Sequence, residues 1–343
     1  MPVQQHVSER LSERLMDSNV VIVNEQANWG SGRRRVREAT EFLRGQGFAF
    51  GLRAAEHPGH ARELAAAAAA ERAGTIVVVG GDGTINEVIN GLLASGQEHV
   101  PRIGIVPAGS SNDFSKSLGI PQHTQEACRN IINGRTRDVD VGQAGIDYFC
   151  SASCLGYFAE VAARSLKMKR FRGSLRYIIP AFSVIREMST GWEMTVRTAQ
   201  RTFHGRYAVL LVSNAPRFGG LTMLPGARPD DGVLDCLLIQ MASKWEALQL
   251  IPLVYCKALE RHRKVTRFQG HIPFRHVGSP VPTVQRRRDV SGPCPEHRLP
   301  RTPSAAAGHL LIPTGHTSST ADPVSGPSNG PGVAPPPDRG MPQ

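Results

Sequence analysis

Residues Thr75–Leu93 read TIVVVGGDGTINEVINGLL, in which an apolar run meets three glycines around one aspartate and then a helical pattern. The β-branched run predicts a buried strand, and Ile85–Leu93 predicts the helix that follows it. Glycines at this junction let the backbone approach a ligand closely, and the helix N-terminus offers unpaired N–H groups to an anion. A tight turn alone explains two glycines, but three glycines with Asp82 favour a phosphate loop whose acid acts on a metal or a proton.

A second strand-to-turn junction lies downstream. Arg102–Val106 predicts another buried strand, which runs into Pro107–Pro121, PAGSSNDFSKSLGIP. Ser and Asn in such a turn are typical of a helix N-cap, and taken alone they indicate no more than that. Open α/β sheets bind their ligands at the edge where the carboxyl ends of the strands lie, so we expect the two loops to form one site.

These two segments resemble the two signatures of the diacylglycerol-kinase catalytic-domain family, which includes bacterial diacylglycerol kinase-like lipid kinases, sphingosine kinases and ceramide kinases. Gly80–Thr84 is similar to its Gly-Gly-Asp-Gly-Thr loop, and Pro107–Phe114 is similar to its second signature, with Ser110 where Thr is commoner. The likeness extends from about Val20 to about Gln285. The more distant NAD kinases share only the first loop, so an NAD kinase-like enzyme is the less favoured reading.

The order of strand and helix patterns predicts an α/β fold. Strands and helices alternate in the N-terminal part, which predicts a parallel-sheet nucleotide-binding domain with helices on both faces. The expected strands are 20–23, 48–53, 75–79, 103–106 and 138–141, and the expected helices are 34–46, 60–72, 85–94 and 122–133. Later strand patterns, at 148–151, 192–197, 207–213 and 233–240, predict a mainly antiparallel β domain. The resemblance implies that this domain is sandwich-like. The domains are therefore assigned as an N-terminal extension (1–19), the catalytic α/β domain (20–144), the β-rich domain (145–277) and a tail (278–343).

The tail differs in composition from the rest of the chain. It holds more than half of the 25 prolines and no Phe, Trp or Tyr, so we expect it to be disordered. In the family, a strand resembling Val281–Gln285 precedes Asp-Gly-Glu, whereas Arg286–Asp289 follows here. Codons for Arg-Arg-Arg-Asp, read from one base later, can encode Asp-Gly-Glu-Met, which suggests a slipped reading frame. The alternative is a genuine basic, proline-rich tail that contacts a membrane or a partner.

The resemblance also assigns the site. It implies ATP and Mg²⁺ as cofactors, and phosphoryl transfer then depends on positioning and on charge neutralisation. Nucleotide binding is implied for Asn24, Gly81, Gly83, Thr84, Gly109, Ser110 and Asn112. A catalytic network of acids, water and metal is implied for Asp82, Asp113 and Asp140. A magnesium site is implied at the Asp231 carboxylate and the carbonyls of Arg228 and Val233, although this Asp-Asp-Gly segment fits an ordinary hairpin turn as well. Asn214 and Gly219-Gly220 also match the family, and they receive no role.

Charge and apolar patterning bear on partners and location. The net charge of +11 favours an acidic partner such as a nucleotide or an anionic membrane. Basic and apolar residues interleave over Arg164–Arg176, which is typical of a membrane-facing helix and equally of a solvated one. Aromatic residues are sparse there, which disfavours nucleic acid. Residues 1–19 lack the apolar core of a signal peptide and no apolar run spans a membrane, so we expect a cytoplasmic protein with peripheral membrane contact. A homodimer is a further candidate partner, and the sequence leaves the oligomeric state open.

The sequence therefore predicts a lipid kinase that transfers the γ-phosphate of ATP to a hydroxyl of diacylglycerol or a related lipid. The acids of Asp-Gly-Glu are missing from residues 286–289. For that reason the alternative is a catalytically impaired relative that binds a nucleotide or a membrane.

Overall fold

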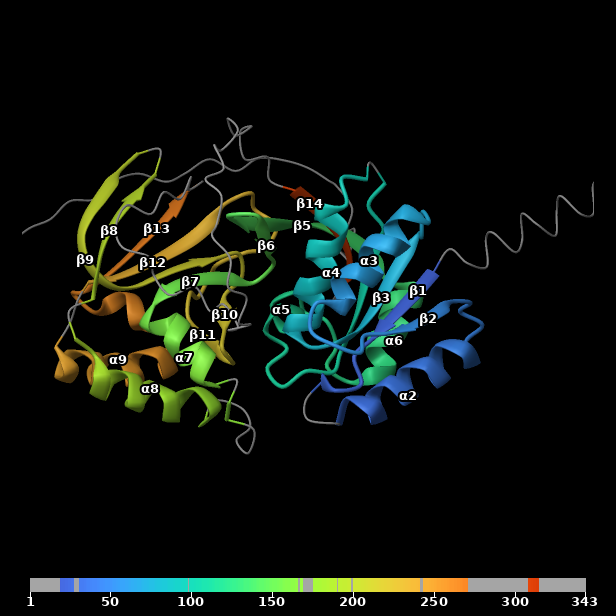
Figure 1. Cartoon of the computed structure of the whole chain (residues 1–343), viewed down its shortest axis with the longest axis horizontal. Coiled ribbons are helices and arrows are strands. Elements are labelled where there is room, and N and C mark those ends of the chain that lie inside the picture. The colour runs from blue at the N-terminus through green and yellow to red at the C-terminus, as the bar shows by residue number, and fades with distance from the viewer. Residues whose placement is uncertain are drawn as a thin grey trace, which may run out of the picture.

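Two lobes lie side by side in the structure, a computed structural model (Figure 1). It describes residues 19–27, 31–97, 99–165, 167–168, 175–189, 191–198, 200–240, 243–270 and 308–314. The N-terminal lobe runs in colour from blue through cyan to the green of its last helix, and the C-terminal lobe runs from green to orange (Figure 1).

A four-stranded parallel sheet forms the centre of the N-terminal lobe, in the order β2-β1-β3-β4. Three of its strands are almost wholly buried and rich in β-branched residues, as expected of a sheet covered on both faces: β1 (Asn19–Val23), β3 (Thr75–Gly80) and β4 (Arg102–Pro107). The edge strand β2 (Gly51–Ala54) is mostly exposed. Expected and observed strands agree in place, with ends that differ by a few residues.

Helices cover both faces of this sheet (Figure 1). Two pack together on one face, α2 (Ser31–Gly45) and α6 (Thr124–Asn133). Two pack together on the other, α3 (His60–Ala70) and α4 (Asp82–Ala94). A short helix, α5 (Asp113–Ser117), follows the turn after β4.

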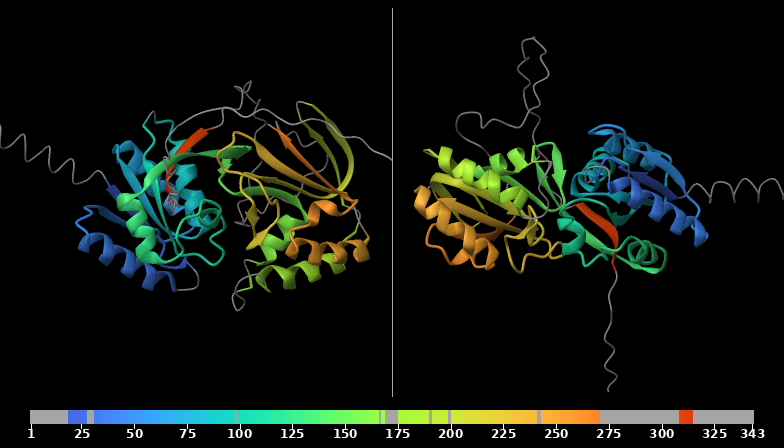
Figure 2. Two further views of the ribbon diagram at one scale, coloured as in Figure 1. Left: turned by 180° about the vertical axis from the view of Figure 1, so that it is seen from behind. Right: turned by 90° about the horizontal axis from the view of Figure 1, so that it is seen from below.

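An antiparallel sheet forms the C-terminal lobe, in the order β13-β12-β9-β7, with β8 also paired to β9. Its strands are β7 (Ala152–Gly156), β8 (Trp192–Arg197), β9 (Thr202–Ser213), β12 (Leu234–Gln240) and β13 (Val265–Gly270). Figure 2 shows the three helices of this lobe gathered on one side of the sheet. They are α7 (Tyr157–Ser165), α8 (Leu175–Glu187) and α9 (Lys244–Tyr255), and the smaller elements are β10 (Arg217–Phe218), β11 (Leu221–Thr222) and η2 (Leu259–Arg261).

Residues 138–141 were predicted to form a strand of the parallel sheet. They lie in strand β5 (Arg135–Ala144), which does not join that sheet, so the predicted pairing is wrong. It pairs antiparallel with β6 (Asp147–Phe149) and with β14 (Gly308–Thr314). An apolar run predicts a strand but does not specify its partner, because pairing depends on contacts distant in the sequence.

One strand, β14, lies within the tail that was predicted to be disordered. The composition of the tail as a whole conceals the local run Leu310–Ile312. Pro313 is tolerated because β14 lies at the edge of its sheet, in the order β14-β5-β6. Residues 271–307, with the Arg286–Asp289 segment, lie outside the described residues.

Each lobe has hydrophobic cores of its own. One core joins β1, β3 and β4 to the four helices around them. In the C-terminal lobe one core lies between the sheet and its helices, and a smaller one lies on the opposite face. No helix among the described residues has both the length and the apolar character that crossing a membrane requires.

Candidate functional site

The glycine-rich turn after β3 and the turn after β4 touch each other at the carboxyl edge of the parallel sheet. Gly81 and Gly109 pack backbone to backbone, because a Cβ atom on Gly109 would lie 2.5 Å from the Gly81 Cα. Asn112 holds the second turn in place with a left-handed φ of 51° and with its Oδ1, which accepts the Gly109 N–H at 2.8 Å. The two loops therefore form one continuous surface.

The turn after β1 fastens to the same place. Asn24 Nδ2 donates to Thr84 Oγ1 at 3.0 Å, and the Asn24 N–H donates to the Val79 carbonyl at 3.1 Å. Gly80 makes room for Thr84, since a Cβ atom there would lie 2.7 Å from the Thr84 Cβ. The protein's own hydrogen bonds thus hold three loops together around the start of α4.

These loops line a polar cavity of about 400 Å³. The predicted nucleotide-binding residues at its wall are Asn24, Gly81, Gly83, Thr84, Gly109 and Ser110, and Asp82 lies among them. Asn112 is buried behind the wall. At Gly83 a Cβ atom would meet nothing within 4 Å, so this glycine faces open space. Because the N-terminus of a helix attracts anions, the start of α4 makes the cavity suitable for phosphate.

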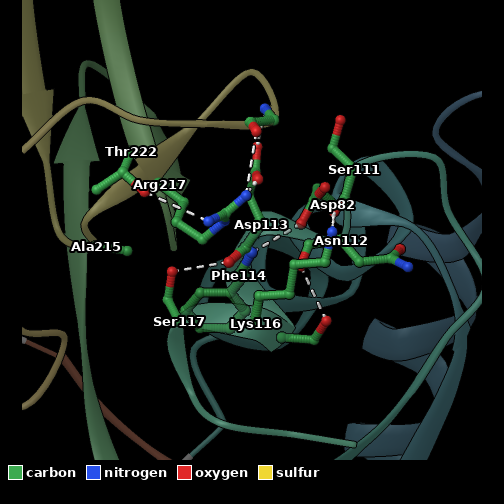
Figure 3. Close-up of polar contacts among 12 residues, drawn as sticks. Asp82, Ser111, Asn112, Asp113, Phe114, Lys116, Ser117, Ala215, Arg217 and Thr222 are labelled. Carbon is green, nitrogen blue, oxygen red and sulfur yellow. Dashed lines mark hydrogen bonds and ion pairs between the residues drawn. The ribbon is translucent and has the colours of Figure 1, made fainter. Parts of the chain in front are cut away.

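Two of the predicted catalytic acids lie where the lobes meet (Figure 3). Asp82 Oδ1 accepts the Phe114 N–H at 3.0 Å. Asp113, only 5% exposed, accepts the Gly220 N–H at 2.7 Å through Oδ2 and Arg217 Nε at 3.3 Å through Oδ1. Asp82 Oδ2 has no hydrogen-bond partner among the described residues, whereas both oxygens of Asp113 are occupied.

The pKa of Asp113 lies above its ordinary value. Burial is the main cause, because removal from water disfavours the charged form. The Gly220 N–H lowers this pKa in part, the neighbouring charge of Asp82 raises it, and Arg217 lowers it. Two carboxylates close to one another in a buried junction are a common feature of functional sites.

The third predicted acid, Asp140 on β5, belongs to a different group. Its Oδ2 accepts the Gly232 N–H at 2.7 Å, and its backbone N–H donates to the Pro229 carbonyl at 2.7 Å. The turn that it contacts carries the predicted metal residues Arg228, Asp231 and Val233. Asp231 is exposed there and accepts the Val233 N–H at 3.2 Å. None of these residues lines the polar cavity.

The three predicted acids do not form one compact metal-binding group. Among the described residues, the only such group is His57, His60 and Glu63, whose ligand atoms lie within 4.8 Å of one another. His60 Nδ1 accepts the Glu56 N–H at 3.2 Å, so in the neutral ring Nε2 carries the proton and is unavailable to a metal. Asp82, with one unengaged oxygen at the cavity wall, is the better candidate for a hard cation.

A second, apolar cavity of about 150 Å³ lies in the C-terminal lobe, between the sheet and helices α7, α8 and α9. Tyr177 at the start of α8 lines both cavities. Its ring lies against Gly219, where a Cβ atom would come within 3.3 Å. The next residue, Gly220, binds Asp113. The two cavities therefore adjoin at Tyr177, next to the turn that binds Asp113.

Sequence reasoning missed Tyr177 and Arg217. The pair Gly219-Gly220 was the one sequence feature that pointed to this region, and the structure explains why both residues are glycine. Both residues have positive φ angles, of 64° and 80°, in the turn between β10 and β11. That turn carries the Gly220 N–H to Asp113 and leaves space for the Tyr177 ring.

Two family descriptions match this chain. Residues 18–144 match the diacylglycerol kinase catalytic domain, and residues 151–281 match the YegS C-terminal NAD kinase beta sandwich-like domain.

Individual relatives agree with these matches. A probable lipid kinase YegS-like protein of Chromohalobacter salexigens is 31% identical over 224 residues, which cover 63% of this chain and 70% of that protein. A probable lipid kinase YegS-like protein of Shewanella frigidimarina is 27% identical over 270 residues, 74% of this chain and 86% of that protein. A diacylglycerol kinase of Bacillus subtilis is 31% identical over 195 residues, 56% of this chain and 63% of that protein.

The fold is also similar to solved structures. A putative diacylglycerol kinase from Bacillus anthracis superposes with a TM-score of 0.60 at 24% identity. The match covers 74% of this chain and 83% of that one. At this identity the likeness describes the architecture of the two lobes.

Proposed function

The chain belongs to the diacylglycerol kinase catalytic-domain family, and from that premise we propose that it is an ATP- and Mg²⁺-dependent lipid kinase. It phosphorylates a hydroxyl of diacylglycerol or a related lipid. The observation that supports this proposal is the junction of a polar and an apolar cavity at Tyr177. A kinase for a water-soluble acceptor has no need of an apolar cavity beside its phosphate loops.

In this proposal the polar cavity holds the triphosphate of ATP. Backbone N–H groups at the start of α4 and the hydroxyls of Thr84 and Ser110 bind its oxygens, and Gly83 leaves the space that the phosphates occupy. Mg²⁺ is bound by few carboxylates together with phosphates and water, which fits Asp82 and its unengaged Oδ2. The ion supplies positive charge that neutralises the transferring phosphoryl group.

The apolar cavity receives part of an acyl chain. Tyr157, Val184 and Leu250 are among its walls, and a chain within it gains about 0.8 kcal/mol for each methylene removed from water. The hydroxyl then lies at the junction, beside Tyr177. Arg217 and Gly220 hold both oxygens of Asp113, so this residue fixes the turn beside Tyr177. We assign the acceptor of the hydroxyl proton to the Asp-Gly-Glu segment that the restored reading frame encodes.

Peripheral contact with an anionic membrane supplies the lipid. Large apolar residues are exposed on the helices that enclose the apolar cavity, and they are Leu175, Phe182, Trp245 and Tyr255. Trp245 is 78% exposed, and the cationic residues Arg186 and Lys244 lie on the same helices. Exposed apolar side chains with basic neighbours are typical of a surface that rests on anionic lipid.

A second candidate function is nucleotide and membrane binding without turnover. The observation that favours it is Arg286–Asp289 in place of Asp-Gly-Glu. Incubation with γ-labelled ATP, Mg²⁺ and diacylglycerol vesicles separates the two. Labelled phospholipid supports the kinase, whereas Mg²⁺-ATP binding without labelled lipid, even after the reading frame is restored, supports the second candidate.

A further inference from the structure

We infer that Arg176 is a phosphate-binding residue, which reaches the terminal phosphates of the nucleotide from the C-terminal lobe. This inference rests on the proposed function, since it deepens the assignment of the polar cavity. It concerns a residue that the sequence grouped with a basic membrane-facing stretch.

Charge at the cavity wall is the first observation. Three acids line the polar cavity, Glu56, Asp82 and Glu87, and among the described residues at its wall Arg176 is the only Lys or Arg. A nucleoside triphosphate carries several negative charges, which these carboxylates repel. One Mg²⁺ at Asp82 offsets part of that repulsion. The Arg176 guanidinium can offset a further part of it, because its planar fork matches two phosphate oxygens.

The position of Arg176 is the second observation. It lies in the first turn of α8, and its Nε donates to the Ser165 carbonyl at 2.8 Å. Ser165 is buried at the end of α7, and its hydroxyl donates to the Ala162 carbonyl at 2.7 Å. An arginine anchored in this way loses less conformational entropy when its fork binds a ligand.

Comparison with two nearby arginines, Arg164 and Arg186, distinguishes Arg176 from residues that face a membrane. Arg164 pairs with Glu187 at 2.5 Å, which ties α7 to α8 away from the polar cavity. Arg186 lies at the far end of α8 and is exposed. Neither lines the polar cavity, and Arg176 does.

The inference has a consequence for the lipid. Arg176 adjoins Tyr177, which lines both cavities, so a phosphate bound to Arg176 fixes the start of the helix that encloses the apolar cavity. Binding of the nucleotide then joins the two lobes and orders the lipid cavity at the same time.

Calorimetric titration of the full chain with ATP, ADP and AMP, each with Mg²⁺, tests the assignment. We expect Arg176→Ala to weaken ATP binding about tenfold or more and AMP binding less than about twofold, because a charged hydrogen bond to the terminal phosphates is lost. Arg176→Lys keeps a cation and a donor for Ser165, so we expect a smaller loss. Arg197→Ala changes an exposed arginine of β8 in the same lobe, so it serves as the matched control and leaves all three affinities unchanged.

The outcomes are distinguishable. If both Arg176 variants lose affinity for AMP and ATP equally, the residue has a structural role and the inference is overturned. Unchanged ATP affinity in Arg176→Ala also overturns it. A wild-type protein that binds none of the nucleotides overturns both the inference and the proposed function. A wild-type protein that shows the expected ATP dependence on Arg176 and labels no lipid contradicts the lipid kinase alone.

Discussion

Gly83 and Gly109 both line the polar cavity, but packing requires only Gly109. A Cβ atom on Gly109 would press on the Gly81 backbone and on Asn112, whereas one on Gly83 meets open space. A glycine that the protein's own packing does not require is a candidate for direct contact with a ligand.

Substitution separates these two roles. We expect Gly83→Ala to keep or raise the thermal midpoint of the wild type, since alanine is favoured over glycine in a helix, and to weaken Mg²⁺-ATP binding. Gly109→Ala is the comparison, and overpacking should lower its stability by about 1–3 kcal/mol. Thermal unfolding and ATP titration measure both. ATP affinity equal to that of the wild type in Gly83→Ala would remove this glycine from the site.

Asp113 predicts a pH dependence of stability. The pKa of Asp113 is higher in the folded protein than in the unfolded chain, so folding favours the protonated form. The contribution of this group to the free energy of unfolding is therefore complete below the unfolded pKa. It is lost as the pH rises through the folded pKa. Asp113→Asn removes this loss. We therefore expect the thermal midpoint of Asp113→Asn, relative to the wild type, to be higher at pH 7 than at pH 4. A relative midpoint that stays constant or falls with pH contradicts the burial of a charged Asp113.

Distance along the chain decides which site residues could be predicted. Asn24, Asp82 and Thr84 follow strand ends, where local patterns indicate a loop. Arg217 reaches Asp113 from 104 residues away, and no local pattern specifies such a contact.

Helix α8 contributes to the walls of both cavities. Its first turn provides Tyr177, and with α9 it encloses the apolar cavity. The apolar cavity could not be predicted from the sequence, because it arises where three helices and a sheet pack imperfectly. Strands β1, β3 and β4 could, since each is a continuous apolar run.

Filling the apolar cavity should affect the lipid alone. Ala247 of α9 lines it, so we expect Ala247→Phe to raise the KM for diacylglycerol and to leave Mg²⁺-ATP affinity unchanged. Gln249→Phe, at an exposed position of the same helix, controls for the added ring. Steady-state kinetics on diacylglycerol in vesicles provide the measurement. Equal lipid KM values in both variants would show that the cavity does not bind the acyl chain.

Polar contacts join the two lobes. Asp113 binds Gly220 and Arg217, and Asp140 binds Gly232 and accepts Asn214 Nδ2 at its backbone carbonyl at 2.5 Å. The change from alternating strands and helices to a strand-rich pattern predicted the two lobes. It could not predict how they join, because the joining residues come from turns with ordinary turn composition.

The proposed frame slip predicts the coding sequence. We expect codons 286–289 to read as Arg-Arg-Arg-Asp in the given frame and as Asp-Gly-Glu-Met when read from the second base of codon 286. Sequencing the gene checks this. Codons that cannot encode Asp-Gly-Glu in the shifted frame would mean that Arg286–Arg288 is a genuine basic element.

Transfer of labelled γ-phosphate from ATP to diacylglycerol, followed in protein expressed from the frame-restored gene, tests the lipid kinase most directly. Labelled phospholipid should form with Mg²⁺. It should fall by about 10²–10⁴ in the same protein carrying Asp82→Asn, in which the Asn side chain can still accept the Phe114 N–H. The chain with Arg286–Asp289 should be nearly inactive. Labelled NADP formed from added NAD in place of labelled lipid, or equal lipid labelling with and without Asp82→Asn, would contradict the proposed function.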